Sequence, residues 1–485
     1  MSKYAFWKAV RHHRKRESRL RYYFLGIAGT AMASLAALLK QKGHEVWGSD
    51  RELYPPMSEF LSRQKIEVQR GFSEQNLSRP FDCAVIGNAL SRGNVEVEAI
   101  LNHHLPFVSL PELIHREFIS EKESVVITGT HGKTTCTALL SWLIENAGRQ
   151  PSFLIGGIAK NFDSSIQLKE GPSFIIEGDE YDSAFFDKTP KFLHYFPRRL
   201  LINNIEFDHA DIYRNLEQIK DAFRKLIRTV PGNGLIVANA DDEAVREVTA
   251  ENYSRLQTFG LEKPADWSAN QIRWDGRFLK LAIYFRGDLQ TEVAFPFPGE
   301  FQAYNILGVV ALARDLGLTW PQITAGLESF QGVARRLEFW GKFQGAPVFD
   351  DFAHHPTAIK KTLSGLRSRF PQRRIIALFE PRTNTMMRNV FQEVLPEAFT
   401  DADVVLIAPP PRHKKVPGSQ RLSLADLAKK LQKQGKKVLL LDAVETIPGA
   451  LKSLLGEDDV CILLTNGDLG GIYPKLRKMV RRAKD

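Results

Sequence analysis

The sequence predicts an α/β protein of three domains. The chain has 485 residues, more than one hydrophobic core usually serves. Apolar strand-like runs alternate with helical patterns from Tyr22 to the C-terminal end, which is typical of layered α/β structure. Two of these runs lead into a glycine loop and a helix start. We therefore expect a Rossmann-like domain at 1–121, a P-loop ATPase-like domain at 122–332 and a second Rossmann-like α/β domain at 333–485.

The first segment begins with an apolar strand, residues 22–25, that leads into Gly26-Ile27-Ala28-Gly29-Thr30. A helix and a second strand follow, and the unit ends at Asp50, about 20 residues beyond the glycines. This order is similar to a dinucleotide fingerprint, with a diphosphate at the helix N-terminus and an acid near a ribose. Gly-x-x-Gly is half of the full Gly-x-Gly-x-x-Gly pattern, so the loop suits a nucleotide-sugar diphosphate as well as NAD.

The second segment carries a phosphate loop. The strand-like run 125–128 leads into Gly129-Thr130-His131-Gly132-Lys133-Thr134-Thr135 and then into a helix-like stretch. Free N–H groups at a helix N-terminus favour a polyphosphate, Lys133 would reach the β- and γ-phosphates, and the Thr134 hydroxyl would ligate Mg²⁺. The first glycine of the full P-loop pattern is missing. An ordinary glycine turn with a solvated lysine is the alternative.

Two acidic loops follow this phosphate loop. One begins at Glu177 after the strand 174–176, and the other spans 203–211 after the strand 200–202 and contains His209. Loops at the carboxyl ends of neighbouring parallel strands converge where ligands bind. Carboxylates and a histidine there could hold Mg²⁺ beside ATP, whereas either loop alone would read as a solvated turn.

The third segment begins a new α/β layer. The strand Val348–Asp350 leads into a loop at 351–356, and further strands are expected at 374–379, 404–408, 438–441 and 460–464. The adjacent His354 and His355 have no Cys or Glu at ligand spacing, so we expect packing or hydrogen bonding from them rather than metal binding.

Charge and cysteine content argue against a nucleic-acid-binding protein and against one stabilised by disulfides or zinc. The net charge of +10 comes from the ends, because residues 1–21 carry +7 and residues 473–485 carry +5, leaving the body near neutral. A basic groove for nucleic acid is therefore not supported, and the basic ends stay unassigned. The three cysteines are odd in number and widely spaced, which fits a reducing compartment better than disulfides or a zinc site.

The N-terminal part also contains an uncharged run, residues 22–39, long enough to suggest a signal or membrane helix. Gly26 and Gly29 interrupt it, and it continues as helix, turn and second strand. We therefore predict a cytoplasmic protein without a transmembrane segment.

Four motifs together resemble the Mur ligases, namely 129–135, 177–182, 203–209 and 350–356, in matching order and spacing along nearly the whole chain. Further stretches resemble the branch of the family that attaches a ready-made peptide during peptidoglycan recycling. They are 54–58, 184–188, 193–195, 380–386 and 465–472.

The resemblance implies ATP-dependent joining of UDP-N-acetylmuramate to the murein tripeptide L-alanyl-γ-D-glutamyl-meso-diaminopimelate, with Mg²⁺. A carboxylate is a poor electrophile in neutral water, so ATP would convert it to an acyl phosphate that the peptide amine then opens. The nearest alternative is the branch that adds single L-alanine to the same UDP-sugar in peptidoglycan biosynthesis. Residues 185–188 and 380–386 favour the tripeptide.

The same resemblance implies roles for individual residues. Lys133, Glu177 and His209 would be catalytic, and Thr134, Glu177 and His209 would ligate the metal. The loop 129–135 would hold the ATP phosphates, Arg335 or Arg336 the γ-phosphate, Asp351 the ribose and Asn305 the adenine. Gly299–Asn305 departs from the family's Gly-x-His-Asn pattern, and Gln302 could substitute for its asparagine. The expected substrate contacts are Gly26, Ala28, Gly29 and Thr30 for the diphosphate, Asp50 near the uridine, and Arg382 and Asn384.

Two functions from other classes are the alternatives. A dinucleotide-dependent oxidoreductase would use the first β-α-β unit, but the incomplete fingerprint and the second phosphate loop oppose it. A non-enzymatic nucleotide switch would bind ATP without substrate-dependent turnover. The oligomeric state does not follow from the sequence.

Overall fold

The structure is a computed structural model that describes residues 19–53, 57–411 and 416–480. Its contacts divide the chain into two compact units. The first contains residues up to 123 together with 166–168 and 179–195, and the second contains the rest. The predicted motif at 54–58 and both basic ends lie partly outside the described residues. The domain boundaries expected after residues 121 and 332 remain predictions.

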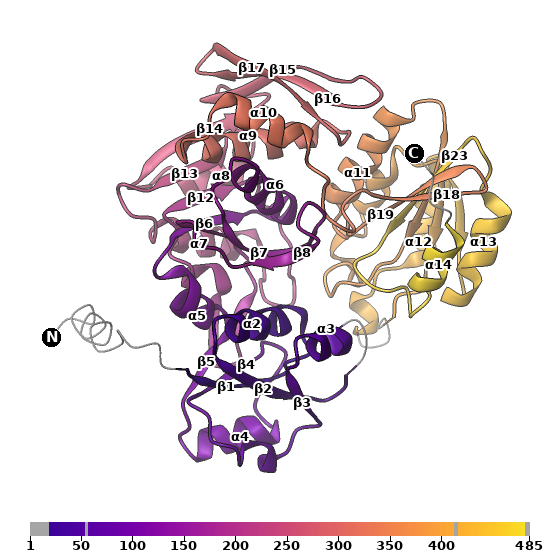
Figure 1. The fold of residues 1–485 in the computed structure, drawn as a ribbon. Coiled ribbons are helices and arrows are strands. Elements are labelled where there is room, and N and C mark those ends of the chain that lie inside the picture. The colour runs from indigo at the N-terminus through magenta and orange to yellow at the C-terminus, as the bar shows by residue number, and fades with distance from the viewer. Residues whose placement is uncertain (1–18, 54–56, 412–415, 481–485) are drawn as a thin grey trace. The chain divides into compact units, whose positions relative to one another are not determined.

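The first unit is built on a sheet of five parallel strands in the order β3-β2-β1-β4-β5 (Figure 1). The order reverses between β1 and β4, and ligands of such sheets bind beyond the carboxyl ends of the strands at that point. Its strands are β1 (Arg21–Leu25), β2 (Glu45–Asp50), β3 (Glu67–Arg70), β4 (Cys83–Ile86) and β5 (Phe107–Ser109), with a hairpin of β10 (Asp182–Ala184) and β11 (Asp187–Pro190). Its α-helices are α2 (Thr30–Gln41), α3 (Met57–Arg63), α4 (Val95–Asn102) and α5 (Leu110–Ile114).

The larger sheet of the second unit has ten strands in the order β17-β16-β15-β14-β13-β12-β6-β9-β7-β8. β6 lies between β12 and β9, and Val125, Val126 and Ile127 within it are fully buried on both faces, as expected of a central parallel strand. The strands are β6 (Glu123–Thr128), β7 (Ser152–Ala159), β8 (Ser164–Gln167), β9 (Ser173–Glu177), β12 (Arg199–Ile202), β13 (Leu235–Asn239), β14 (Arg255–Gly260), β15 (Trp267–Trp274), β16 (Leu279–Phe285) and β17 (Asp288–Phe295). The helices are α6 (Lys133–Asn146), α7 (Leu216–Ile227), α8 (Glu243–Thr249), α9 (Phe301–Asp315) and α10 (Trp320–Glu328).

The smaller sheet of this unit has six strands in the order β18-β19-β23-β20-β21-β22, parallel except for β18. Alternate residues of its strands enter two separate cores. Ile375 and Ala377 pack with α11 and α12, whereas Ile376 and Leu378 pack with α13 and α14. The strands are β18 (Glu338–Phe343), β19 (Ala346–Asp351), β20 (Arg374–Phe379), β21 (Val404–Ile407), β22 (Lys437–Leu440) and β23 (Asp459–Leu464). The helices are α11 (Pro356–Arg369), α12 (Leu424–Lys433), α13 (Ile447–Leu454) and α14 (Tyr473–Met479).

The predicted α/β class is confirmed, with one main sheet in each of the three expected segments: the first is parallel, the second has antiparallel β15–β17 at one edge, and the third is parallel except for β18. Strands predicted from apolar runs lie within one or two residues of their observed bounds, because a short apolar run that ends in a glycine or polar loop favours a strand buried on both faces. Among the described residues, no helix is both long and apolar enough to cross a membrane.

Candidate functional site

The glycine loop between β6 and α6 has the backbone that its sequence requires. Gly129 and Gly132 have φ angles of 131° and 85°, a region that favours glycine. A Cβ atom on Gly132 would lie 2.5 Å from Asn203 Nδ2 and 2.7 Å from Asn305 Oδ1. Glycine at 132 is therefore demanded both by the turn and by the close packing below it.

Two asparagines that follow β12 hold this loop, a role that the sequence did not predict for them. The His131 backbone N–H donates to Asn204 Oδ1 (2.7 Å), and the amide nitrogens of Asn203 and Asn204 donate to the His131 carbonyl (3.1 and 3.2 Å). The Thr130 hydroxyl accepts from the Glu206 N–H at 2.8 Å. The sequence does contain a signal for this role, an Asn-Asn pair directly after an apolar strand. Side-chain amides buried at such a position need hydrogen-bond partners.

The start of α6 gathers some of the predicted phosphate and metal residues, namely Lys133, Thr134, Glu177 and Arg336. Lys133 Nζ donates to the Gly129 carbonyl at 2.7 Å, across the loop. Thr134 Oγ1 donates to Glu177 Oε2 at 3.0 Å and accepts from Arg336 Nη2 at 3.2 Å. Thr134, Glu177 and Arg336 therefore form one cluster, although they come from three distant parts of the chain. Thr135 lies partly exposed in the first turn of α6.

Glu177 has an unusual electrostatic position within this cluster. Burial raises the pKa of its carboxyl, while the Gly156 N–H, Arg336, Lys133 and Thr134 favour the ionised form. A carboxylate hydrogen-bonded to a hydroxyl, with cations close by, is an oxygen donor set of the kind that Mg²⁺ prefers. The residues present therefore fit a magnesium ion.

Asn305 and Gln302 lie in the first turns of α9, underneath the phosphate loop. Asn305 is buried, and its amide donates to Gln302 Oε1 at 3.0 Å. Its carbonyl oxygen accepts from Asn203 Nδ2 at 3.1 Å and from the Cys136 thiol at 3.3 Å. These contacts support the loop from below, and the predicted adenine contact of Asn305 stays a prediction.

Arg335 and Asp351 lie at the entry to the smaller sheet. Arg335 has a positive φ of 61°, and its guanidinium donates to the Thr465 carbonyl at 2.6 Å and lies 3.4 Å from Asp350. Both carboxylate oxygens of Asp351 accept backbone N–H groups, from Leu337 at 2.7 Å and Ala353 at 2.8 Å. Asp351 therefore fixes the local backbone, and its expected ribose contact stays a prediction.

The loop that contains His209 is held by residues of the third segment. His209 has a positive φ of 56°. The next residue, Ala210, donates its N–H to Thr385 Oγ1 at 3.0 Å, and the Asn384 amide donates to Asp211 at 3.1 Å. The structure thus brings Asn384 to the His209 loop, while Arg382 pairs with Asp468 at 2.9 Å.

The predicted diphosphate loop of the first unit is a tight turn at the carboxyl end of β1. Gly26 has a φ of 77°, and Gly29 caps α2, which begins at Thr30, without a side-chain cap. The Ala28 N–H donates to Asp50 Oδ2 at 2.8 Å. Asp50, expected near the uridine, therefore contacts the loop backbone itself; its substrate role stays a prediction.

Comparisons with known proteins cover all three segments. Residues 21–120 match the profile "Mur ligase family, catalytic domain", residues 127–313 match "Mur ligase middle domain", and residues 335–467 match "Mur ligase, glutamate ligase domain".

Individual relatives span almost the full chain. The UDP-N-acetylmuramate–L-alanyl-gamma-D-glutamyl-meso-2,6-diaminoheptandioate ligase of Haemophilus influenzae is 38% identical over 457 residues, covering 94% of this chain and 98% of that protein. The UDP-N-acetylmuramate–L-alanine ligase of Syntrophus aciditrophicus is 31% identical, covering 96% of this chain and 94% of that protein. The crystal structure of a murein peptide ligase from Psychrobacter arcticus is 31% identical with a TM-score of 0.71, covering 95% of this chain and 98% of that chain.

Proposed function

Because the chain belongs to the Mur ligase family, whose members are ATP-dependent amide ligases, we propose that it joins L-alanyl-γ-D-glutamyl-meso-diaminopimelate to UDP-N-acetylmuramate in peptidoglycan recycling. The observation that carries this proposal is the cluster of Thr134, Glu177 and Arg336 at a phosphate loop, in a chain 38% identical to ligases of that name. The L-alanine-adding relatives have lower identity, 29–32%.

The proposed reaction has two steps. The lactyl carboxylate attacks the γ-phosphorus of ATP, giving an acyl phosphate and ADP. The N-terminal amine of the tripeptide then attacks the acyl carbon, and inorganic phosphate leaves from the tetrahedral intermediate. The protein contributes positioning and charge stabilisation in both steps.

Residues around α6 would act on the transferred phosphoryl group. Lys133 would move from the Gly129 carbonyl to the β- and γ-phosphates, since a charged ammonium favours a polyanion over a neutral carbonyl. Arg336, already at the Thr134 hydroxyl, would stabilise charge on the γ-phosphoryl oxygens. The free N–H groups of the first turn of α6 would hold the phosphates.

We propose Thr134, Glu177 and His209 as magnesium ligands. When bound, Mg²⁺ would neutralise negative charge on the ATP phosphates. The Thr134 hydroxyl and the Glu177 carboxylate already lie 3.0 Å apart, so both oxygens can face one ligand position.

We also propose substrate-binding roles for residues of the first unit and of the third segment. Gly26, Ala28, Gly29, Thr30 and Asp50 would bind the UDP moiety, and Arg382 and Asn384 the peptide. The support is that the first loop lies where ligands of doubly wound sheets bind, and that Asn384 contacts the His209 loop. A cytoplasmic location is proposed because ATP and a UDP-sugar are intracellular metabolites.

The test is phosphate release from ATP, Mg²⁺ and UDP-N-acetylmuramate with the free tripeptide in one reaction and L-alanine in another. Turnover with tripeptide only is the expected result. Turnover with L-alanine only would transfer the chain to the biosynthetic branch, and no turnover in either would overturn the ligase proposal.

A matched pair of lysine variants makes this test specific to the phosphate loop. Lys133→Met keeps the length of the side chain but removes its charge, and turnover should fall by roughly 100-fold or more. Lys429→Met changes an exposed lysine on α12 and should leave turnover unchanged. Equal effects of the two substitutions would contradict the role of Lys133.

A further inference from the structure

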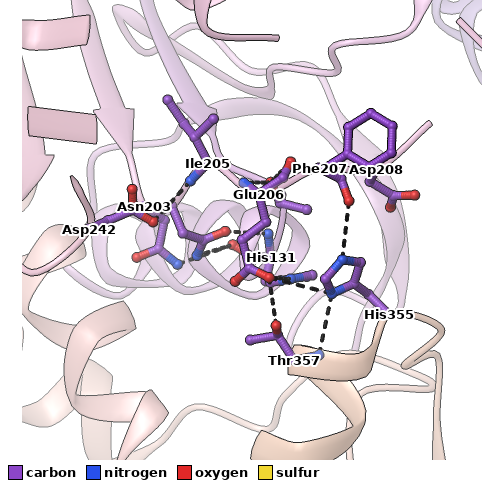
Figure 2. Close-up of polar contacts among 12 residues, drawn as sticks. His131, Asn203, Ile205, Glu206, Phe207, Asp208, Asp242, His355 and Thr357 are labelled. Atoms are coloured by element: carbon purple, nitrogen blue, oxygen red, sulfur yellow. Dashed lines mark hydrogen bonds and ion pairs between the residues drawn. The ribbon is translucent and has the colours of Figure 1, made fainter. Parts of the chain in front are cut away.

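Two histidines and a glutamate from three separate segments meet beside the phosphate loop (Figure 2). His131 belongs to that loop, Glu206 to the loop after β12, and His355 precedes α11 as its N-cap. Glu206 Oε2 lies 3.6 Å from His131 Nε2 and 3.5 Å from His355 Nδ1. One atom of each of the three side chains lies within 4.8 Å of the other two.

These distances are too long for hydrogen bonds and suit a shared cation. An imidazole nitrogen or carboxylate oxygen lies about 2.0–2.2 Å from Zn²⁺, so two tetrahedral ligands are roughly 3.4 Å apart. The observed distances of Glu206 Oε2 from His355 Nδ1 and His131 Nε2, 3.5 and 3.6 Å, are close to this ligand–ligand separation. His131 Nε2 is buried and has no hydrogen-bond partner among the residues that the structure describes.

The protonation states of these groups suit a cation. Burial lowers the pKa of His131 to about 4, outweighing the opposite effect of Glu206. Although burial opposes ionisation of Glu206, His131, His355 and the Thr357 hydroxyl lower its pKa to about 2. At neutral pH the cluster therefore presents a neutral imidazole of His131 and a carboxylate, the forms that bind metal.

Outer contacts orient two of the three side chains. The His355 Nε2 lies 3.3 Å from the Phe207 carbonyl, so an N–H there leaves the Nδ1 lone pair facing Glu206. The Thr357 hydroxyl donates to Glu206 Oε2 at 2.5 Å. Metal-binding histidines and carboxylates commonly have such outer partners. The Thr357 N–H also reaches His355 Nδ1, at 3.3 Å, and a cation would take over this lone pair.

We propose that His131 Nε2, His355 Nδ1 and Glu206 Oε2 bind one divalent transition-metal cation of the Zn²⁺ class. Two nitrogen donors distinguish this site from the oxygen-rich position at Thr134 and Glu177, because imidazole suits Zn²⁺ and its neighbours whereas Mg²⁺ prefers oxygen. The Glu206 side chain is 28% exposed, which gives an ion a route in. A bound ion ties the phosphate loop to the N-terminus of α11.

Co²⁺ is the direct probe, because its visible spectrum reports ligand geometry. Full-length protein is titrated with Co²⁺ in the presence of excess Mg²⁺, which occupies oxygen-rich sites, and Zn²⁺ is then added. The expected result is one equivalent of Co²⁺ with the intense visible bands of a tetrahedral site, displaced by Zn²⁺. Absence of these bands would overturn the proposal and leave the cluster as a polar contact only.

Two variants remove ligands with little change in shape. Glu206→Gln keeps an acceptor for the Thr357 hydroxyl, and His355→Asn keeps an N-cap acceptor for α11. Each should weaken Co²⁺ binding by at least roughly 100-fold. Thr357→Val removes only the hydroxyl that contacts Glu206 and should weaken Co²⁺ binding less, by roughly 10-fold.

His103→Asn is the control, because His103 is an exposed histidine that lies 3.1 Å from Glu74 in the first unit. It should leave Co²⁺ affinity unchanged. Circular dichroism verifies that each variant is folded, and Co²⁺ binding that survives both ligand substitutions in folded protein would contradict the assignment. Ligase turnover is not the readout, so this result is independent of the proposed function.

Discussion

Arg336 Nη2 donates a hydrogen bond to Thr134 Oγ1 over 3.2 Å, although 202 residues separate them in the sequence. The Thr134 hydroxyl in turn donates a hydrogen bond to Glu177, so a single hydroxyl connects an arginine just before β18 with a carboxylate at the end of β9. The arginine thus lies beside the phosphate loop.

Replacing Arg336 should reduce catalysis more than nucleotide binding. In Arg336→Ala the γ-phosphoryl group loses a fixed positive charge, so kcat should fall by roughly 100–1,000-fold with a smaller rise in the KM for ATP. Steady-state kinetics measures both. Arg286→Ala, which removes an exposed arginine paired with Asp266, serves as the control and should leave kcat unchanged. A large rise in KM at constant kcat would assign Arg336 to ground-state binding instead.

Gly132 and Gly148 lie on either side of α6 and allow a matched test of the phosphate loop. Both have positive φ, 85° and 76°, so an alanine costs about 1–2 kcal/mol of backbone strain at each. Only at Gly132 would the new Cβ collide with Asn203 and Asn305; at Gly148 nothing lies within 4 Å. Gly132→Ala should therefore lower the melting temperature more than Gly148→Ala and should also abolish ATP binding. Calorimetric unfolding and ATP titration measure these effects, and equal losses in the two variants would show that strain alone matters.

Magnesium dependence should change with pH because of Glu177. Burial raises the pKa of this carboxyl, so protons compete with Mg²⁺ at a higher pH than for an ordinary glutamate. The apparent KM for Mg²⁺ should rise as the pH is lowered from neutrality towards the pKa of this carboxyl. In Glu177→Gln this side chain cannot ionise, so the KM for Mg²⁺ of the residual activity should no longer rise as the pH is lowered. A KM for Mg²⁺ that is constant over this range would argue against Glu177 as a ligand.

Asp350 should make the protein less stable as the pH rises from about 4 to about 7. It is fully buried, burial raises its pKa to about 7 against the opposing effect of Arg335, and Tyr473 donates to it. A carboxyl with a raised folded-state pKa favours folding when protonated. Its contribution is therefore complete below its unfolded pKa near 4 and is lost as the pH approaches 7, by an amount on the order of a few kcal/mol.

Asp350→Asn tests this because an amide cannot ionise. Relative to the native protein, the variant should gain stability as the pH is raised from about 4 to about 8. Chemical denaturation at several pH values measures the difference in free energy of unfolding. Asp288→Asn, at an exposed position in β17, should give a difference that does not change with pH. A pH-independent difference for Asp350→Asn would show that Asp350 is ionised throughout.

Much of the fold and part of the site could be predicted from the sequence. The run 125–135 predicts a strand, a glycine turn and a helix. Each follows from residues next to one another in the chain: an apolar run, two glycines that adopt positive φ and the start of a helix. The sequence also predicted a common site for Thr134 and Glu177, and the structure brings the two side chains into hydrogen-bond contact, while their metal-binding role stays a prediction. The sequence did not show that Asn203 and Asn204 hold the phosphate loop, because their amides need a partner whose identity depends on which strand lies beside β12.

The sequence by itself determined the α/β class, the phosphate loop and the family, because each rests on short-range patterns of burial, turn geometry and spacing. Only the tertiary structure decided which distant side chains meet. His355 showed no metal partner in the sequence, yet it lies 3.5 Å from Glu206, whose loop also contacts the phosphate loop through Thr130. Such contacts depend on strand order and register, with β6 between β12 and β9, and these are set by the packing of the whole sheet.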